Sequence, residues 1–220
     1  MSDLLPLLKP LKGDFGGGHR SLVDYKICRD NEGKVNLRFS IAIANVGSGD
    51  LKIVLGEPQQ IGEKTRAPAK QIILQDDGGQ REVDAGFYDL HEEQHDDHGH
   101  IHWHYNGLAT LELITKDGKK LKESEKEGYC LADSFPYPNF QAYRKDQFHP
   151  SGCERRGESS VGLTVGWCDY YKFGTDRQFI PIEDVPSGEY QIRFTVNKAP
   201  PGSASSPYMI YEVEDPEVID

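Results

Sequence analysis

The stretch VNLRFSIAIA, residues 35–44, alternates between two kinds of side chain. The odd positions carry large apolar residues, namely Val35, Leu37, Phe39, Ile41 and Ile43. The residues between them are polar or small. Successive side chains of a β-strand point to opposite faces, so this period of two predicts a strand with one buried face. The Gly47-Ser48-Gly49 sequence that follows predicts a turn.

Further short strand candidates lie on both sides of this stretch. They occupy residues 22–28, 51–55, 71–74, 81–90, 108–115, 190–197 and 207–213. Turn signals such as Asp76-Asp77-Gly78-Gly79 separate them, and Asp117-Gly118 predicts a hairpin that returns through residues 119–122. No long amphipathic helix is evident. We therefore predict an all-β fold, a single-domain antiparallel β-sandwich or barrel-like core with long loops and little helix.

The chain has 220 residues, which is enough to bury a good core in one domain. We predict a single domain over residues 1–220. Residues 1–20 form an irregular lead-in in this prediction, because prolines and a glycine run break any period. Residues 133–158 are rich in Pro, Gly, Asn and charge, which predicts a long functional loop packed on the surface.

Composition excludes several classes of partner. The net charge of -11 argues against nucleic acid and anionic membranes, which require a basic face. No apolar run approaches the roughly 20 residues of a membrane span. The N-terminal sequence MSDLLPLLKPLKGDF lacks the apolar core of a signal peptide, which leaves a cytoplasmic location open. The absence of GxGxxG and P-loop motifs counts against a nucleotide-dependent enzyme.

Six of the eight histidines lie in the segment HEEQHDDHGHIHWH at residues 91–104. On an extended strand, His98, His100, His102 and His104 would share one face. The outer two of three alternating histidines start about 13 Å apart, so the strand should curl or bulge for their rings to reach one ion. Three neutral imidazoles without thiolate or carboxylate favour copper or zinc.

Two other interpretations of the histidine segment stay open. The segment could be a histidine-rich surface loop that binds metal only adventitiously. A non-haem iron oxygenase would need a carboxylate ligand, and Glu92, Asp96 or Asp97 could contribute one, although none has a clear spacing.

Three stretches in order resemble the catalytic domain of the lysyl oxidase family. They are HIHWH at 100–104, KEGYCLAD at 126–133 and GWCDYYKFGTDRQFIPIEDVPSGEYQIRFTVN at 166–197. The opening DLLP at 3–6 and the strand LRFSIAIANVGSGDL at 37–51 are also similar to that family. The resemblance covers nearly the whole chain and indicates a microbial-type, single-domain member.

The resemblance implies a copper-dependent amine oxidase. Copper would be held by His100, His102 and His104, whereas His98 lies outside the family triplet. A lysine tyrosylquinone cofactor would form from Lys126, four residues before the cysteine of the Cys-Leu pair, and Tyr171, the second residue after Asp169. The quinone carbonyl would condense with a primary amine, and a general base, for which we propose Asp169, would remove the proton next to nitrogen.

Each of these roles has a structural alternative. Lys126 lies in a run of charged residues that is typical of a solvated face, and Tyr171 is one of 11 tyrosines. Asp169 could form an Asx turn instead of acting as a base. The main alternative function is a non-catalytic copper- or zinc-binding β-domain in which Lys126 and Tyr171 stay unmodified.

The four cysteines, Cys28, Cys130, Cys153 and Cys168, form no CxxC motif and allow three disulfide pairings. The family resemblance suggests Cys130 with Cys153, which leaves Cys28 with Cys168. The resemblance also favours a secreted protein and implies a primary-amine or lysine-containing peptide or protein as substrate. The oligomeric state does not follow from the sequence.

Overall fold

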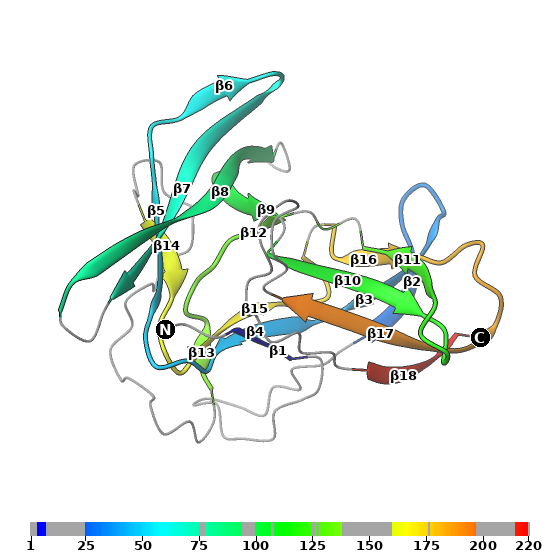
Figure 1. Ribbon diagram of the computed structural model, residues 1–220. Coiled ribbons are helices and arrows are strands. Elements are labelled where there is room, and N and C mark those ends of the chain that lie inside the picture. The colour runs from blue at the N-terminus through cyan, green and yellow to red at the C-terminus, as the bar shows by residue number, and fades with distance from the viewer. Residues whose placement is uncertain are drawn as a thin grey trace. The chain divides into compact units, whose positions relative to one another are not determined.

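The computed structural model describes residues 4–7, 25–74, 78–93, 100–106, 108–124, 126, 128–137, 160–175, 177–196 and 214–219. At residues 25, 91–93, 100–102, 106 and 214–219 this description covers the main chain only. All regular elements in these ranges are β-strands (Figure 1), and those of the seven-, four- and three-stranded sheets described below pair as antiparallel ladders. The predicted all-β antiparallel fold is therefore confirmed. The described residues contain no helix long and apolar enough to cross a membrane.

The chain packs as two compact units. Unit 1 comprises Met1–Leu4, Ala44–Asn106 and Gly128–Asp169, and unit 2 comprises Leu5–Ile43, Gly107–Glu127 and Tyr170–Asp220. The chain passes between them inside three strands, β1 (Leu4–Leu7), β4 (Ile41–Asn45) and β15 (Trp167–Tyr171). The predicted irregular lead-in is thus wrong over Leu4–Leu7, where Leu4 and Pro6 are buried as alternating residues of a strand.

Unit 1 is built on a seven-stranded sheet with the strand order β12-β9-β8-β7-β5-β14, in which β6 also pairs with β7 (Figure 1). These strands are β5 (Leu51–Leu55), β6 (Gln59–Ile61), β7 (Lys64–Leu74), β8 (Gln80–Glu93), β9 (His100–Asn106), β12 (Gly128–Tyr129) and β14 (Ser160–Leu163). A further short strand, β13 (Phe135–Pro136), pairs with the first residues of β15. The largest fully buried side chains of unit 1 include Tyr88, Tyr129, Leu131 and Leu163.

The segment between the predicted strands at 51–55 and 71–74 contains a hairpin, because β6 pairs with the first residues of β7. Strand β7 begins at Lys64, and Pro68 lies inside it, where the β7–β8 register shifts between Pro68 and Lys70. Proline lacks an N–H and is tolerated in a sheet at such an irregularity.

Unit 2 contains a four-stranded sheet of order β11-β10-β17-β18 and a three-stranded sheet of order β16-β3-β2. Their bounds are β2 (Tyr25–Arg29), β3 (Val35–Phe39), β10 (Ala109–Ile114), β11 (Lys120–Glu123), β16 (Phe179–Pro181), β17 (Gly188–Val196) and β18 (Glu214–Ile219). The predicted hairpin is confirmed, since β10 pairs with β11 and Gly118 in its turn has a φ of 84°. Glycine adopts that left-handed conformation without strain.

The stretch at residues 35–44 forms two strands, β3 and the start of β4, with a break at Ser40. Leu37, Phe39, Ile41 and Ile43 are buried, as the period of two predicts. The break is stabilised by a tertiary contact, because the main-chain N–H of Phe173 donates a hydrogen bond to Ser40 Oγ at 3.0 Å.

One further prediction is corrected, and two others lie largely outside the described residues. The sequence suggests that the histidine strand continues into residues 108–115, but β9 ends at Asn106 in unit 1 and β10 begins at Ala109 in unit 2. Most of the predicted loop, residues 138–158, and the predicted strand at 207–213 lie outside the described residues.

Candidate functional site

The main chain of the histidine strand lies between β8 and β12 in the sheet of unit 1. His100, His102 and His104 occupy alternate positions of β9, and they lie opposite Glu93, His91 and Asp89 of β8. Of these three histidines the side chain is described only for His104, which is half-buried. His95 and His98 lie outside the described residues, and the side chains that are described contain no three-residue metal cluster.

The residue types present match the copper site that the family resemblance implies. The register of β9 gives three histidines the regular spacing of alternate strand positions. The residue across from His104 is Asp89, a buried carboxylate. Metal-bound histidines usually have such a carboxylate or a carbonyl nearby to orient the ring. Imidazole donors also match the ligand preference of copper.

Asp89 carries two ion pairs that no local sequence pattern predicts. Arg66 Nε lies 2.9 Å from Asp89 Oδ1, and Lys64 Nζ lies 3.1 Å from Asp89 Oδ2. Arg66 is directly opposite Asp89 in the β7–β8 ladder. The two cations compensate the cost of burying this carboxylate beside the histidine strand.

Three tyrosines occupy consecutive strands of the same sheet. Tyr88 pairs with Tyr105, and Tyr105 pairs with Tyr129, so the register carries one tyrosine on each of β8, β9 and β12. The rings of Tyr88 and Tyr105 stack with their centroids 4.9 Å apart. Tyr88 and Tyr129 are fully buried, and the Tyr88 hydroxyl has no hydrogen-bond partner among the described residues.

Asp169, the predicted base, is a buried carboxylate near these tyrosines. Burial raises the pKa of Tyr88 well above its ordinary value, and the neighbouring Tyr105 and the charge of Asp169 raise it further. The pKa of Tyr129 is also raised, first by burial and then by the Asp169 charge. An ionised tyrosine beside this carboxylate would add a second buried negative charge, which is why both pKa values are shifted upward.

Lys126 and Tyr171 lie together in unit 2. The Lys126 ammonium Nζ lies 5.0 Å from the centroid of the Tyr171 ring, over its face. Tyr171 is buried, with 8% of its surface exposed, and Lys126 is half-buried. In this geometry the cation is attracted to the π-electrons of the ring. Lys126 therefore differs from the exposed residues Lys119 and Lys120 of the same charged run.

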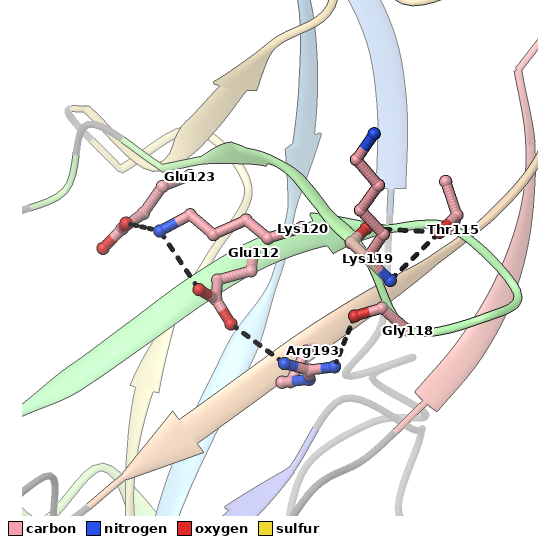
Figure 2. A network of polar contacts seen from close by, with 7 residues as sticks. All are labelled: Glu112, Thr115, Gly118, Lys119, Lys120, Glu123 and Arg193. Carbon is pink, nitrogen blue, oxygen red and sulfur yellow. Dashed lines mark hydrogen bonds and ion pairs between the residues drawn. The ribbon is translucent and has the colours of Figure 1, made fainter.

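A network of polar contacts fixes the hairpin that leads to Lys126 (Figure 2). Lys120 of β11 pairs with Glu123 and, at 3.2 Å, with Glu112 of β10. Arg193 of β17 lies 3.6 Å from Glu112 and donates a hydrogen bond to the Gly118 carbonyl at 3.3 Å. An isolated exposed ion pair contributes little to stability. These contacts, however, link β10, β11 and β17, and β11 ends shortly before Lys126.

The chain between β11 and Lys126 is held by further hydrogen bonds. The Ser124 N–H donates to the Leu111 carbonyl at 2.8 Å, and the Lys126 N–H donates to Ser124 Oγ at 3.2 Å. The polar contacts of the hairpin therefore extend to the main chain of Lys126 itself.

The backbone of Tyr171 is held by a residue that sequence reasoning missed. Gln178 is fully buried, and its amide Nε2 donates to the Tyr171 carbonyl at 3.0 Å and to the Phe39 carbonyl at 2.6 Å. No local signal marks this residue, because a glutamine between Arg177 and Phe179 reads as an ordinary loop residue.

The predicted disulfide between Cys28 and Cys168 is wrong, because both are free thiols. Cys168 is buried in β15, and this burial, followed by the charge of Asp169, raises the pKa of its thiol. An even number of cysteines does not bring two Cα atoms within the narrow range a disulfide needs. Cys130 is disulfide-bonded, but Cys153 lies outside the described residues, so that pairing stays a prediction.

The chain is thus all-β, with three alternating histidines on one strand of unit 1 and a lysine over a buried tyrosine in unit 2. The family model described as Lysyl oxidase matches residues 81–203, more than half of the chain. The chain therefore belongs to the lysyl oxidase family, a family of copper-dependent amine oxidases.

Two curated relatives illustrate how far this similarity extends. Lysyl oxidase homolog 2 of Gallus gallus is 33% identical over 99 residues, which are 44% of this chain and 12% of that protein. Lysyl oxidase homolog 3 of Homo sapiens is 32% identical over 103 residues, 47% of this chain and 12% of that protein. The matched region thus spans a small part of these relatives' length.

Proposed function

We propose that this chain oxidises primary amines, including lysyl side chains, through a lysine tyrosylquinone formed from Lys126 and Tyr171. The observation that carries the proposal is the Lys126 ammonium 5.0 Å from the centroid of the Tyr171 ring. A cross-link requires the amine to reach this ring, and the amine already lies over the face of the ring. Family membership supports the copper-dependent amine oxidase class.

The proposed cofactor arises by oxidation of the Tyr171 ring and addition of the lysine amine. Copper bound by His100, His102 and His104 would supply the dioxygen chemistry. One dioxygen would oxidise the ring, leaving one oxygen atom on it and one in water. The Lys126 nitrogen would then bond to a ring carbon, which loses its hydrogen as the ring takes up the electron pair. A second dioxygen would remove two electrons and two protons, which gives the cross-linked quinone and hydrogen peroxide. Lys126 must lose its proton before it can attack.

In the proposed turnover, a primary amine, dioxygen and water give an aldehyde, ammonia and hydrogen peroxide. The carbon next to nitrogen loses a proton and an electron pair, and dioxygen accepts the electrons. We assign proton removal to Asp169, a buried carboxylate two residues before Tyr171 in the same strand. The net charge of -11 supports cationic amines or lysine-rich peptides as substrates.

Copper-loaded protein held in air tests the proposal. It should absorb visible light, react with phenylhydrazine and release peroxide with primary amines. Peptide mapping after disulfide reduction should find the Lys126 and Tyr171 peptides joined. Lys126→Ala and Tyr171→Phe should abolish all three signals while copper stays bound.

Two variants of the neighbourhood serve as matched controls. Tyr170→Phe removes the adjacent hydroxyl, which donates to Ser40 Oγ at 3.4 Å, and Lys122→Ala removes a lysine that pairs with Asp184 at 2.7 Å. Both should keep the colour and the cross-link. A fully copper-loaded aerobic sample with no cross-link and no peroxide would instead favour a metal-binding β-domain without catalysis.

A further inference from the structure

We propose that Gln178 is a positioning residue for Tyr171, which holds the main chain of this tyrosine so that its ring stays beneath the Lys126 amine while the cross-link forms. The inference rests on the proposed function and deepens it. It assigns a role to a residue that touches neither metal nor substrate and that acts through the backbone.

The first step is the contact itself. The Gln178 side chain has no exposed surface. Its Nε2 donates to the Phe39 carbonyl at 2.6 Å and to the Tyr171 carbonyl at 3.0 Å, with a longer contact of 3.4 Å to the Lys172 carbonyl. Phe39 is the last residue of β3 and Tyr171 the last of β15. One buried amide therefore joins the ends of two strands at the tyrosine.

The second step is how Gln178 is itself placed. The Thr175 N–H donates to the Lys172 carbonyl at 2.9 Å, and the Gln178 N–H donates to the Thr175 carbonyl at 3.2 Å. Between them, Arg177 has a φ of 52°, a left-handed conformation that few residues other than glycine adopt. A non-glycine residue in this region costs free energy, so the surrounding contacts must impose it.

Residues of β3 and β16 also hold the turn between Lys172 and Gln178. The Arg38 guanidinium donates to the carbonyls of Phe173 and Thr175, each at 3.4 Å. Its Cζ also lies 5.1 Å from the centroid of the Phe179 ring. Phe179 pairs directly with Arg38 in the β16–β3 ladder. The turn that presents Gln178 to Tyr171 is thus fixed to a neighbouring strand.

The third step concerns what the cross-link requires. The Lys126 nitrogen lies over the ring face, which is the side from which an amine adds to a quinone, but it has to come close to one particular ring carbon to form the new bond. The hydrogen bond that Gln178 donates to Tyr171 goes to the main-chain carbonyl, so it fixes the backbone from which the ring is presented to the amine. A displacement of about 1 Å at a reacting group can slow a reaction roughly a hundredfold.

The experiment measures quinone formation in the full-length protein. Gln178→Met keeps a similar volume but has no N–H to donate. After copper is added in air, the visible absorbance and the cross-linked peptide should appear roughly tenfold to a hundredfold more slowly than in the wild type. Copper stoichiometry and the far-ultraviolet circular dichroism should not change.

A second variant and a matched control separate positioning from general destabilisation. Gln178→Asn keeps an amide that is one methylene too short to reach both carbonyls, so it should also slow the reaction. Thr164→Val removes a buried hydroxyl that donates to Asp133 at 2.5 Å in unit 1, and should form the quinone at the wild-type rate. If Thr164→Val formed the quinone as slowly as Gln178→Met, lost stability would explain the slow reaction and the inference would be overturned.

The remaining outcomes distinguish the two proposals. A wild-type rate in either Gln178 variant, with the cross-link present in the wild type, overturns the positioning role and leaves the proposed function intact. A wild-type protein that forms no cross-link at all overturns both.

Discussion

At the scale of single residues, unit 1 contains two buried polar side chains whose energetics differ. The Asp89 carboxylate has two cationic partners, whereas the Tyr88 hydroxyl has no hydrogen-bond partner in the part of the chain that the structure describes. Removing a partnered buried group leaves its partners unsatisfied, but removing an unpartnered hydroxyl relieves a desolvation cost. Replacing Asp89 by Asn should therefore lower the free energy of unfolding, whereas replacing Tyr88 by Phe should leave it unchanged or raise it slightly.

Asp89→Asn should lower the free energy of unfolding by about 1 to 3 kcal/mol, because Arg66 and Lys64 lose their charged acceptor. Urea titration measures this. The control is Glu82→Gln, which removes the exposed partner of Lys70 in the same pair of strands and should have no measurable effect. Equal losses in the two variants would show that the burial of Asp89 is energetically unimportant.

Tyr88→Phe should leave stability at pH 7 unchanged or slightly raised and should change its alkaline pH dependence. The folded-state pKa of Tyr88 is raised by burial, then by Tyr105 and Asp169. The unfolded chain therefore releases this proton first, and the wild type loses stability as the pH rises above about 10. The variant should lose less stability over that range. Identical pH profiles would contradict the predicted burial of this hydroxyl.

At the scale of elements, the core of unit 2 contains the apolar side chains that occupy every second position from Leu37 to Ile43. Phe39 ends β3 with 1% of its surface exposed, and its carbonyl accepts the hydrogen bond from Gln178. The alternation identified Leu37, Phe39, Ile41 and Ile43 as buried, but it showed neither the break at Ser40 nor that β4 is buried on both faces. That break depends on Phe173, which is distant in sequence.

Phe39→Ala should lower the free energy of unfolding by roughly 3 to 5 kcal/mol, because it leaves a cavity in a packed core. Chemical denaturation provides the measurement. Phe173→Ala is a suitable control, since Phe173 is 36% exposed and its main-chain N–H is retained. A loss under about 1 kcal/mol for Phe39→Ala would mean that the position repacks without a cavity.

At the scale of the whole molecule, the candidate residues divide between the two units. The histidine strand belongs to unit 1, and Lys126 and Tyr171 belong to unit 2. The family match over residues 81–203 includes parts of both units. Variants of Lys126 and Tyr171 should therefore keep copper, whereas variants that lose copper should also form no cofactor.

His100→Ala, His102→Ala and His104→Ala should each sharply reduce copper content, because each removes one of the three predicted ligands. His91→Ala and His95→Ala should not, although His91 lies directly opposite His102 in the β8–β9 ladder. Metal analysis of purified variants decides between these outcomes. Equal copper losses for His91→Ala and His100→Ala would show that the predicted triplet is wrong.

The sequence by itself determined the all-β fold, the buried face of residues 37–43 and the hairpin at Gly118. These features follow from side-chain period and turn chemistry, which are local properties of the chain. Only the tertiary structure decided that Lys126 lies over Tyr171, that Gln178 holds the Tyr171 carbonyl and that Cys28 and Cys168 stay unpaired. Such contacts join residues far apart in sequence, and they depend on how separate strands pack, which no local pattern encodes.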